Sequence, residues 1–158
     1  MNYLAHIYLS GNEPILQIGN FMADSVRGKS YLEMPELIQK GILLHREIDT
    51  FTDSHPIFRQ GTKRLHPNYH HYAGVIMDLF YDHFLSKNWS RFSEVPLEDF
   101  IAQFYRDISA NSELLTDKVK EFYPFMIRYD WLGSYGSFDG LQRILIQMDH
   151  RTKNRSNM

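Results

Sequence analysis

One stretch of the sequence carries a histidine and two aspartates at intervals of four residues. His45, Asp49 and Asp53 lie within residues 41–56, Gly-Ile-Leu-Leu-His-Arg-Glu-Ile-Asp-Thr-Phe-Thr-Asp-Ser-His-Pro. On a helix, a step of four residues turns the side chain by only about 40°, so the three groups would share one stripe. An imidazole and two carboxylates are suitable ligands for Mn, Mg, Fe or Zn. A solvated polar face has the same pattern, and the stretch alone fits both interpretations equally.

Two other segments carry polar groups at the same spacing. Asn20 and Asp24 lie four residues apart, and so do Asp78 and Asp82, with His83 directly after them. Apolar residues surround the second pair, so its helix has little surface to spare for water. Two buried carboxylates raise each other's pKa, whereas a divalent cation stabilises both in the ionised form. We therefore interpret this pair as part of a site rather than as a structural salt bridge, while His83 alone is more typical of a histidine packed between helices.

A glycine precedes each of these polar sets. Gly19, Gly41 and Gly74 all lie within one helical turn of the first polar residue. Glycine inside a helix costs roughly 0.5–1 kcal/mol relative to alanine, so its presence calls for a compensating reason. We expect either a close approach between helices or room for a ligand beside the acidic side chains.

The composition is that of one folded domain. The chain has 158 residues, of which 43% are hydrophobic and 15% aromatic, so it can form a sizeable core. It has no cysteine, which excludes disulfides and thiolate metal sites, and its net charge of −2 gives no general attraction to nucleic acid. No apolar run approaches the ~20 residues of a membrane span, and residues 1–6 carry no basic segment of a signal peptide. We therefore expect a cytoplasmic protein that binds neither nucleic acid nor membranes.

Helical periodicity dominates the chain, and no alternating strand pattern is evident. The sequence predicts an all-α fold, a single compact domain of about seven or eight helices over residues 1–150, with a polar, frayed tail at 151–158. Asn12 and Pro14 should start a helix that Gly28 ends, and Pro35 should start the next one, which runs to Pro56. Further helices are expected at 57–65, at 69–88, at 96–109 and at 138–151, with a break between the first two at Pro67. One more helix should begin after a cap at Asn111 or Ser112 and have a kink at Pro124.

Four motifs in order resemble the acyl carrier protein phosphodiesterase family. They are Met-Asn-Tyr-Leu-Ala-His at 1–6, Gly-Asn-Phe-Met-Ala-Asp-Ser-Val-Arg-Gly at 19–28, the stretch at 41–56, and Asp-Leu-Phe-Tyr-Asp-His-Phe-Leu at 78–85. The resemblance is close over the first 90 or so residues and looser beyond them. The family is similar in turn to the HD-domain phosphohydrolases, which implies an HD-domain-like fold with divalent metal held by histidines and aspartates. This sequence departs from the HD signature, because Asp82-His83 reverses the usual order of the two residues.

The resemblance implies hydrolysis of the phosphodiester that joins 4′-phosphopantetheine to a serine of holo acyl carrier protein. It implies a divalent metal, Mn²⁺ first, with Mg²⁺ or Fe²⁺ as alternatives. The residues assigned to the metal on this basis are Asp24, His45, Asp49 and Asp82. The catalytic candidates are His6, Asp24, His45, Asp78 and His83, with Asp78 as a further ligand or an orienting group, and His6 and His83 as ligands or as the general acid at the serine leaving group.

Basic residues are expected to bind the phosphate of the substrate and the acidic carrier protein. Arg27 and Arg46 could neutralise phosphate, although Arg46 points about 100° away from His45 on a helix and is better placed to pair with an acid. The candidates for a docking patch are Arg27, Lys29, Arg59, Lys63 and Arg64. Asp53 and His55 are expected to close the long stretch through a turn at the helix end.

Three other interpretations compete with this one. The first is an HD-like phosphohydrolase of a nucleotide or small phosphoester, since fold and metal ligands do not select a substrate. The second is a catalytically inactive helical binding protein whose acidic stripes form salt bridges. The third is redox di-iron chemistry, which the absence of a Glu-x-x-His pair disfavours. The sequence predicts no oligomeric state.

Overall fold

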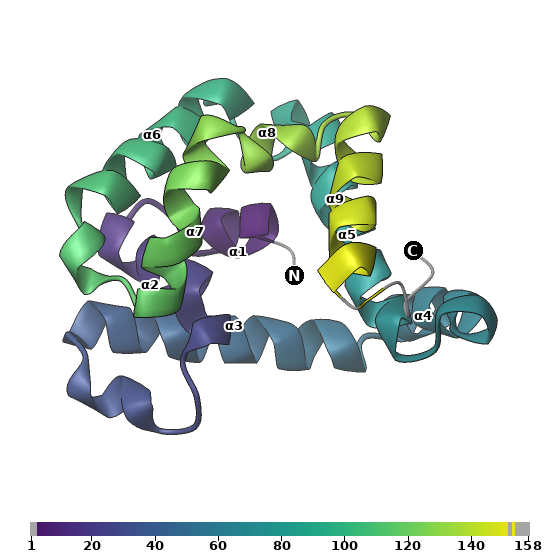
Figure 1. The fold of residues 1–158 in the computed structure, drawn as a ribbon, viewed down its shortest axis with the longest axis horizontal. Helices are drawn as coiled ribbons and strands as arrows, with labels where there is room; N and C mark the ends of the chain where they lie inside the picture. Colours follow the sequence, from purple (N-terminus) through teal and green to yellow (C-terminus); the bar gives the residue numbers. More distant parts are fainter. Residues whose placement is uncertain (1–2, 152, 154–158) are drawn as a thin grey trace.

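The computed structural model describes residues 3–151 and 153, and within them the chain is helical, with no β-strand. The prediction of an all-α fold is thus confirmed (Figure 1). The α-helices, in chain order, are α1 (Tyr3–Leu9), α2 (Pro14–Met22), α3 (Glu36–Ser54), α4 (Pro56–Tyr69), α5 (Ala73–Lys87), α6 (Leu97–Ala110), α7 (Asp117–Arg128), α8 (Trp131–Ser134) and α9 (Phe138–Arg151). Short 3-10 helices join them: η1 (Ala23–Ser25), η2 (Ser30–Glu33), η3 (His70–Tyr72), η4 (Trp89–Arg91) and η5 (Ser112–Leu114).

Prolines mark several helix starts as the sequence predicts. Pro35 and Pro96 directly precede α3 and α6, and Pro56 is the first residue of α4. The expected break at Pro67 is wrong, because α4 continues through Pro67 to Tyr69 and the chain turns only at His70, whose φ is +49°. A proline in the last turn of a helix blocks only one backbone hydrogen bond, which α4 tolerates.

Three predicted helix ends differ from the structure. Glu13, not Asn12, caps α2, since its side chain accepts a hydrogen bond from the backbone N–H of Ile15 at 3.3 Å. That helix ends at Met22 and continues as η1, so Gly28 lies in the following loop with φ +55°. Thr116 caps α7, instead of Asn111 or Ser112, because η5 occupies the intervening residues.

The core forms where α1 and α2 meet the surrounding helices. In Figure 1, α3 runs along one side of the molecule, α6 and α7 lie at one end, and α5 and α9 lie at the other. The largest fully buried side chains come from most of these elements and include Leu4, Ile7, Ile18, Met22, Ile38, Ile42, Leu79, Phe104, Ile108, Met126 and Leu132. Burial of this apolar surface is the main force that holds α1 in place.

The backbones of α2 and α3 touch at two glycines. A Cβ atom on Gly19 would lie 2.6 Å from the carbonyl oxygen of Ile38, and one on Gly41 would lie 2.7 Å from the backbone nitrogen of Asn20. Both distances are too short for any other residue, so the predicted close approach is confirmed for this pair. A Cβ atom on Gly74 would meet no other element of the described chain within 4 Å, so no helix packs closely there.

Two sequence expectations concern the chain end and membranes. The frayed tail at 151–158 falls largely outside the described residues, since only Arg151, the last residue of α9, and Lys153 are placed. Among the helices that the structure describes, none combines the length and apolar character that crossing a membrane requires.

Candidate metal centre

The polar motifs of the sequence converge on one small pocket. Its volume is about 150 Å³, and it lies where the first residues of α1 meet the end of α2, η1, α3 and α5. The lining residues are Tyr3, His6, Asn20, Phe21, Asp24, His45, Asp49, Asp53 and Asp78. The structure thus brings together His6, Asp24, His45, Asp49 and Asp78, which come from the four motifs of the sequence.

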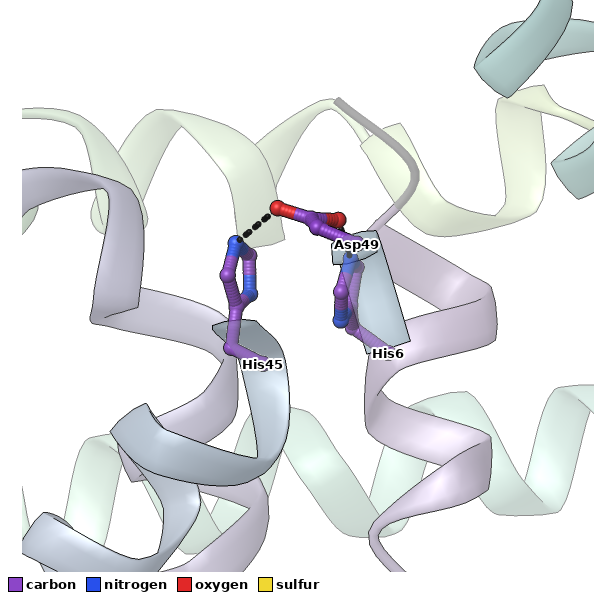
Figure 2. A group of neighbouring side chains, drawn as sticks. All are labelled: His6, His45 and Asp49. Carbon is purple, nitrogen blue, oxygen red and sulfur yellow. Dashed lines mark hydrogen bonds and ion pairs between the residues drawn. The ribbon is translucent and has the colours of Figure 1, made fainter. Parts of the chain in front are cut away.

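Two histidines face one carboxylate in this pocket. Figure 2 shows the side chain of Asp49 above the two imidazole rings, with one oxygen directed toward each. Nε2 of His45 lies 3.1 Å from Oδ2 of Asp49, and Nε2 of His6 lies 3.1 Å from Oδ1. The rings are stacked, with centroids 3.9 Å apart and planes 15° apart. One ligand atom from each of the three residues can be chosen so that all lie within 4.8 Å of one another.

The orientation of His45 follows from its hydrogen bonds to Asn20. Nδ1 of His45 lies 2.9 Å from the backbone oxygen of Asn20 and 3.1 Å from its side-chain oxygen. Both oxygens only accept hydrogen bonds, so Nδ1 carries the proton and Nε2 is directed into the pocket. A histidine that binds metal through one nitrogen and donates from the other to a carbonyl has this arrangement.

Asn20 connects three of the helices that form the pocket, α1, α2 and α3. Its amide nitrogen donates to the backbone oxygen of His6 at 3.1 Å and to Oγ of Ser10 at 2.8 Å, and its side chain is fully buried. Because Gly19 and Gly41 let α2 and α3 touch, Asn20 can reach His45 and α1 at once. The sequence showed Asn20 only as the partner of Asp24 at a spacing of four, so its positioning role was missed.

His6 is held differently from His45. Its Nδ1 is buried and has no hydrogen-bond partner among the described residues. The ring is therefore oriented by its stacking on His45 and by the contact of Nε2 with Asp49. A buried nitrogen without a partner costs free energy, and such exceptions call for a functional explanation. Retaining an imidazole in a metal-binding group is one such explanation.

The charges of the pocket are strongly coupled. Burial of the ring lowers the pKa of His45, but hydrogen bonds to Asp24 and Asp49 outweigh this effect and raise the pKa to about 9. Burial raises the pKa of Asp49, but His45 and His6 outweigh it, so the net pKa is well below the usual range. The hydrogen bond from His45, at 3.2 Å, also lowers the pKa of Asp24. Burial raises the pKa of Asp78.

The donor set fits a divalent transition metal. Two imidazole nitrogens and one carboxylate converge here, and the carboxylate of Asp24 lies beside His45 on the same pocket wall. Mixed nitrogen and oxygen ligands of this kind suit Mn, Fe and Zn better than Ca, which prefers oxygen alone. His6, His45 and Asp49 are therefore a candidate metal-binding group, and Asp24, whose Oδ1 lies 3.2 Å from Nε2 of His45, is an additional carboxylate beside it.

We predict that metal binding releases about one proton at pH 7. The metal-free pKa of His45 is about 9, so its ring carries a proton that a cation must displace. The apparent affinity should rise about tenfold per pH unit up to pH 9. Titration calorimetry in two buffers of different ionisation enthalpy measures the released proton. The absence of any proton release would show that His45 is neutral or does not bind the metal.

Asp82 lies outside this pocket. It is fully buried in α5, and its two oxygens accept hydrogen bonds from the backbone N–H groups of Leu4 and Ala5, at 3.0 and 2.9 Å. Burial raises its pKa to about 7, although these two hydrogen bonds oppose the shift. This arrangement argues against the predicted role of Asp82 as a metal ligand, because both of its oxygens already accept hydrogen bonds from the first turn of α1.

His83 also lies outside the pocket and has a structural partner. Its Nδ1 donates to the backbone oxygen of Tyr135 at 2.7 Å, and its ring packs against Phe84 and Phe138. It thus connects α5 with the segment from α8 to α9, in keeping with an interhelical histidine rather than with the predicted catalytic role. Residues five apart on a helix point about 140° apart, so Asp78 and His83 cannot serve the same pocket from one helix face.

The predicted basic residues are distributed over two regions. Arg46 has no acidic partner among the described residues; it donates to the backbone oxygens of Val26 and Gly28, at 3.3 and 2.8 Å, and thereby fixes the loop that follows Asp24. Arg27 and Lys29 lie on that loop, where Lys29 is exposed. The side chain of Lys118, which the sequence did not single out, lines a second cavity of about 110 Å³ together with Asp24.

The other basic candidates lie on α4. Arg59 and Lys63 line a groove of about 600 Å³ with His66, His70 and other residues, and Arg64 is exposed on the same helix. Nε of Arg59 donates to the backbone oxygen of Asp53 at 3.2 Å, which joins this helix to the end of α3. The expected turn at His55 is confirmed, because its Nδ1 accepts from the N–H of Ile57 at 3.3 Å.

Comparisons with known proteins agree with these features. A family model described as acyl carrier protein phosphodiesterase matches residues 1–158. A protein of that name from Klebsiella pneumoniae is 33% identical over 155 residues, which cover 96% of this chain and 79% of the relative. Its counterparts from Enterobacter sp. (strain 638) and Photorhabdus laumondii are each 32% identical, over 96% of this chain and over 79% and 77% of the relatives. No solved structure matches the chain significantly.

Proposed function

Because the chain belongs to the acyl carrier protein phosphodiesterase family, we propose that it hydrolyses holo acyl carrier protein to apo carrier protein and free 4′-phosphopantetheine. The oxygen of a water molecule bonds to phosphorus, the bond between phosphorus and the serine oxygen breaks, and the serine oxygen takes up a proton as it leaves. The observation that carries this proposal is the pocket in which His6 and His45 face the carboxylate of Asp49.

We propose His6, His45, Asp49 and Asp24 as the residues that hold the metal, with His6 in place of Asp82. Mn²⁺ is the leading cation and Fe²⁺ the first alternative, since two imidazoles favour a transition metal, whereas the remaining alternative, Mg²⁺, prefers oxygen ligands. A divalent cation supplies polarisation of the phosphoryl oxygens and lowers the pKa of water. The two histidines are positioned before any ligand arrives, because Asn20 orients His45 and stacking orients His6.

The remaining pocket residues have separate roles in the proposal. Asp78 lines the same pocket, and burial raises its pKa, so it is the candidate group that holds a proton for the departing serine oxygen. Arg27 lies on the loop after Asp24, and Lys118 lines the neighbouring cavity. Both cations are candidates for contact with phosphate charge, which guanidinium and ammonium groups bind well.

One assay tests the proposed function directly. Metal-loaded protein is incubated with holo acyl carrier protein, and the carrier is followed by mass spectrometry for the loss of one phosphopantetheine. A chelator-treated sample and apo carrier protein serve as controls. Well-folded, metal-loaded protein that leaves the holo carrier intact would reject this function in favour of a nucleotide or small phosphoester substrate, or of a binding protein.

We also propose that the cations of α4 bind the acidic carrier protein. The groove lined by Arg59 and Lys63 is joined to the pocket through the bond between Arg59 and Asp53, which itself lines the pocket. A carrier protein held on α4 would therefore lie beside the site. Complementary charge of this kind mainly raises the association rate and makes it sensitive to salt.

Reversal of two charges on α4 tests this docking surface. Lys63→Glu with Arg64→Glu should lower kcat/KM for holo carrier protein by about tenfold or more at low salt, because attraction becomes repulsion. Arg59 is left intact, since it holds the end of α3. Exposed Lys87, the last residue of α5, and exposed Arg91, the last residue of η4, provide a matched double reversal that should have little effect. An equal loss on a small phosphodiester would contradict docking at α4.

A further inference from the structure

A large cavity lies next to the candidate metal centre and has no part in it. Its volume is about 660 Å³, within the range of roughly 300–1,000 Å³ that is typical of small-molecule sites. Residues of α7, α8 and α9 form most of its wall, including Phe125, Trp131, Ile144 and Met148, and Tyr135, which follows α8, completes it. In the view of Figure 1, α7, α8 and α9 lie around α1, the helix that carries Tyr3 and His6.

Tyr3 connects this cavity with the metal centre. Its side chain lines the cavity of about 660 Å³, the pocket of about 150 Å³ that holds His6 and Asp49, and the smaller cavity beside Asp24. The ring of Tyr3 is held in place by Phe21, with centroids 4.8 Å apart, and by Phe122, with centroids 6.4 Å apart. Tyr3 is therefore a wall that the two spaces share, and a ligand that has its phosphate at the histidines would reach the larger cavity by passing this ring.

The lining of the cavity combines aromatic surface with a few polar groups. Trp131, Tyr135 and Met148 provide apolar contact, while Ser134, Arg143 and Gln147 provide hydrogen-bonding groups. The side chains of Arg143 and Gln147 are exposed, so a ligand that enters the cavity can contact them. Such a lining suits an extended chain in which apolar segments alternate with amides, because the polar groups can pair with the amides as the apolar segments are buried.

We propose that this cavity binds the pantetheine arm of the substrate, with its two secondary amides, its dimethyl group and its terminal ethylene thiol. The inference rests on the proposed function for the position of the phosphate, and it adds the site of the arm. The phosphodiester lies at His6, His45 and Asp49, and the arm runs past Tyr3 between α7, α8 and α9. Gln147 is a specificity-determining residue at the exposed wall of this cavity.

Binding of the arm alone is measured with S-methyl pantetheine, which carries neither phosphate nor free thiol. The protein has two tryptophans, and of these Trp131 lines the cavity. Trp89 is buried elsewhere, with its indole N–H donating to the backbone oxygen of Val95 at 2.7 Å. In a ¹H–¹⁵N titration the indole resonance of Trp131 should shift saturably at millimolar ligand, and that of Trp89 should not. An unmoved Trp131 resonance overturns the inference.

Two substitutions of the same residue type on α9 form a matched pair. Gln147→Phe fills the exposed wall of the cavity, whereas Gln142→Phe changes an exposed residue that does not line it. Gln147→Phe should weaken S-methyl pantetheine at least tenfold and raise KM for holo carrier protein about tenfold, and Gln142→Phe should change neither. Equal behaviour of the two variants overturns the inference. Because the titration needs no turnover, it decides the arm site even if the assay rejects the proposed function.

Discussion

Replacement of His45 by asparagine is expected to abolish metal binding and to lower phosphodiesterase activity by at least about 10²–10³-fold. The amide of asparagine can still donate to the oxygens of Asn20, as Nδ1 does in the native protein, but nothing replaces Nε2 between Asp24 and Asp49. Residues that merely orient a ligand already contribute roughly 10–100-fold to metal affinity, so a direct ligand should contribute more. Metal content by elemental analysis and kcat/KM for holo carrier protein measure the two effects.

His83→Asn is the matched control for this prediction. His83 is also buried on a helix and also donates from Nδ1 to a backbone oxygen, that of Tyr135, but it does not line the pocket. Its replacement should therefore reduce stability modestly while the metal content stays at the wild-type level. If His83→Asn loses the metal and His45→Asn keeps it, the candidate centre is wrong and the sequence-based role of His83 is restored.

Without metal, the His45→Asn variant should also lack the pH dependence of stability that the ring of His45 gives to the wild type. In the native protein the pKa of His45 is about 9, above its ordinary value of 6.5, so folding favours the protonated ring. The stabilisation is complete below pH 6.5 and is lost as the pH rises through 9. Metal-free His45→Asn should lack this decline between pH 6.5 and 9, which urea unfolding at several pH values can follow.

Local signals in the sequence predicted most of the helices and half of the pocket. Hydrophobic periodicity and the prolines at 35, 56 and 96 place the starts of α3, α4 and α6 closely, because both signals act within a few residues of the chain. The spacing of four that links His45 to Asp49 is likewise a property of one helix. These residues therefore lie together in the structure as expected.

Contacts between helices were the part that the sequence could not specify. His6 belongs to a segment of only a few residues, and its approach to Asp49 depends on how α1 packs against α2 and α5. Asp82 has the spacing of a ligand, yet the packing of α1 directs both of its oxygens to backbone N–H groups. Periodicity identifies which face of a helix is polar, but not which element that face meets.

The role of Asp82 leads to the second large prediction, which concerns stability. The first turn of α1 has no acidic residue of its own, and its N–H groups at Leu4 and Ala5 are paired by Asp82 from α5 instead. Asp82→Ala leaves the buried N–H of Leu4 and the half-buried N–H of Ala5 without this partner, at roughly 1–3 kcal/mol each, so the free energy of unfolding should fall by about 2–6 kcal/mol. Asp82→Asn should cost less, because one oxygen remains to accept a hydrogen bond. Urea unfolding measures both variants.

Asp82→Ala should also affect the metal centre, because it loosens α1. His6 and Tyr3 lie on that helix, so a loosened first turn should weaken metal affinity by roughly 10–100-fold without changing the number of ions bound. Asp99→Ala, an exposed acid in the first turn of α6, is the control and should alter stability by about 0.5 kcal/mol or less. A variant at Asp82 that unfolds like the wild type but binds no metal would instead identify this carboxylate as a ligand. Stability and stoichiometry together therefore separate a residue that holds α1 in place from one that holds the ion.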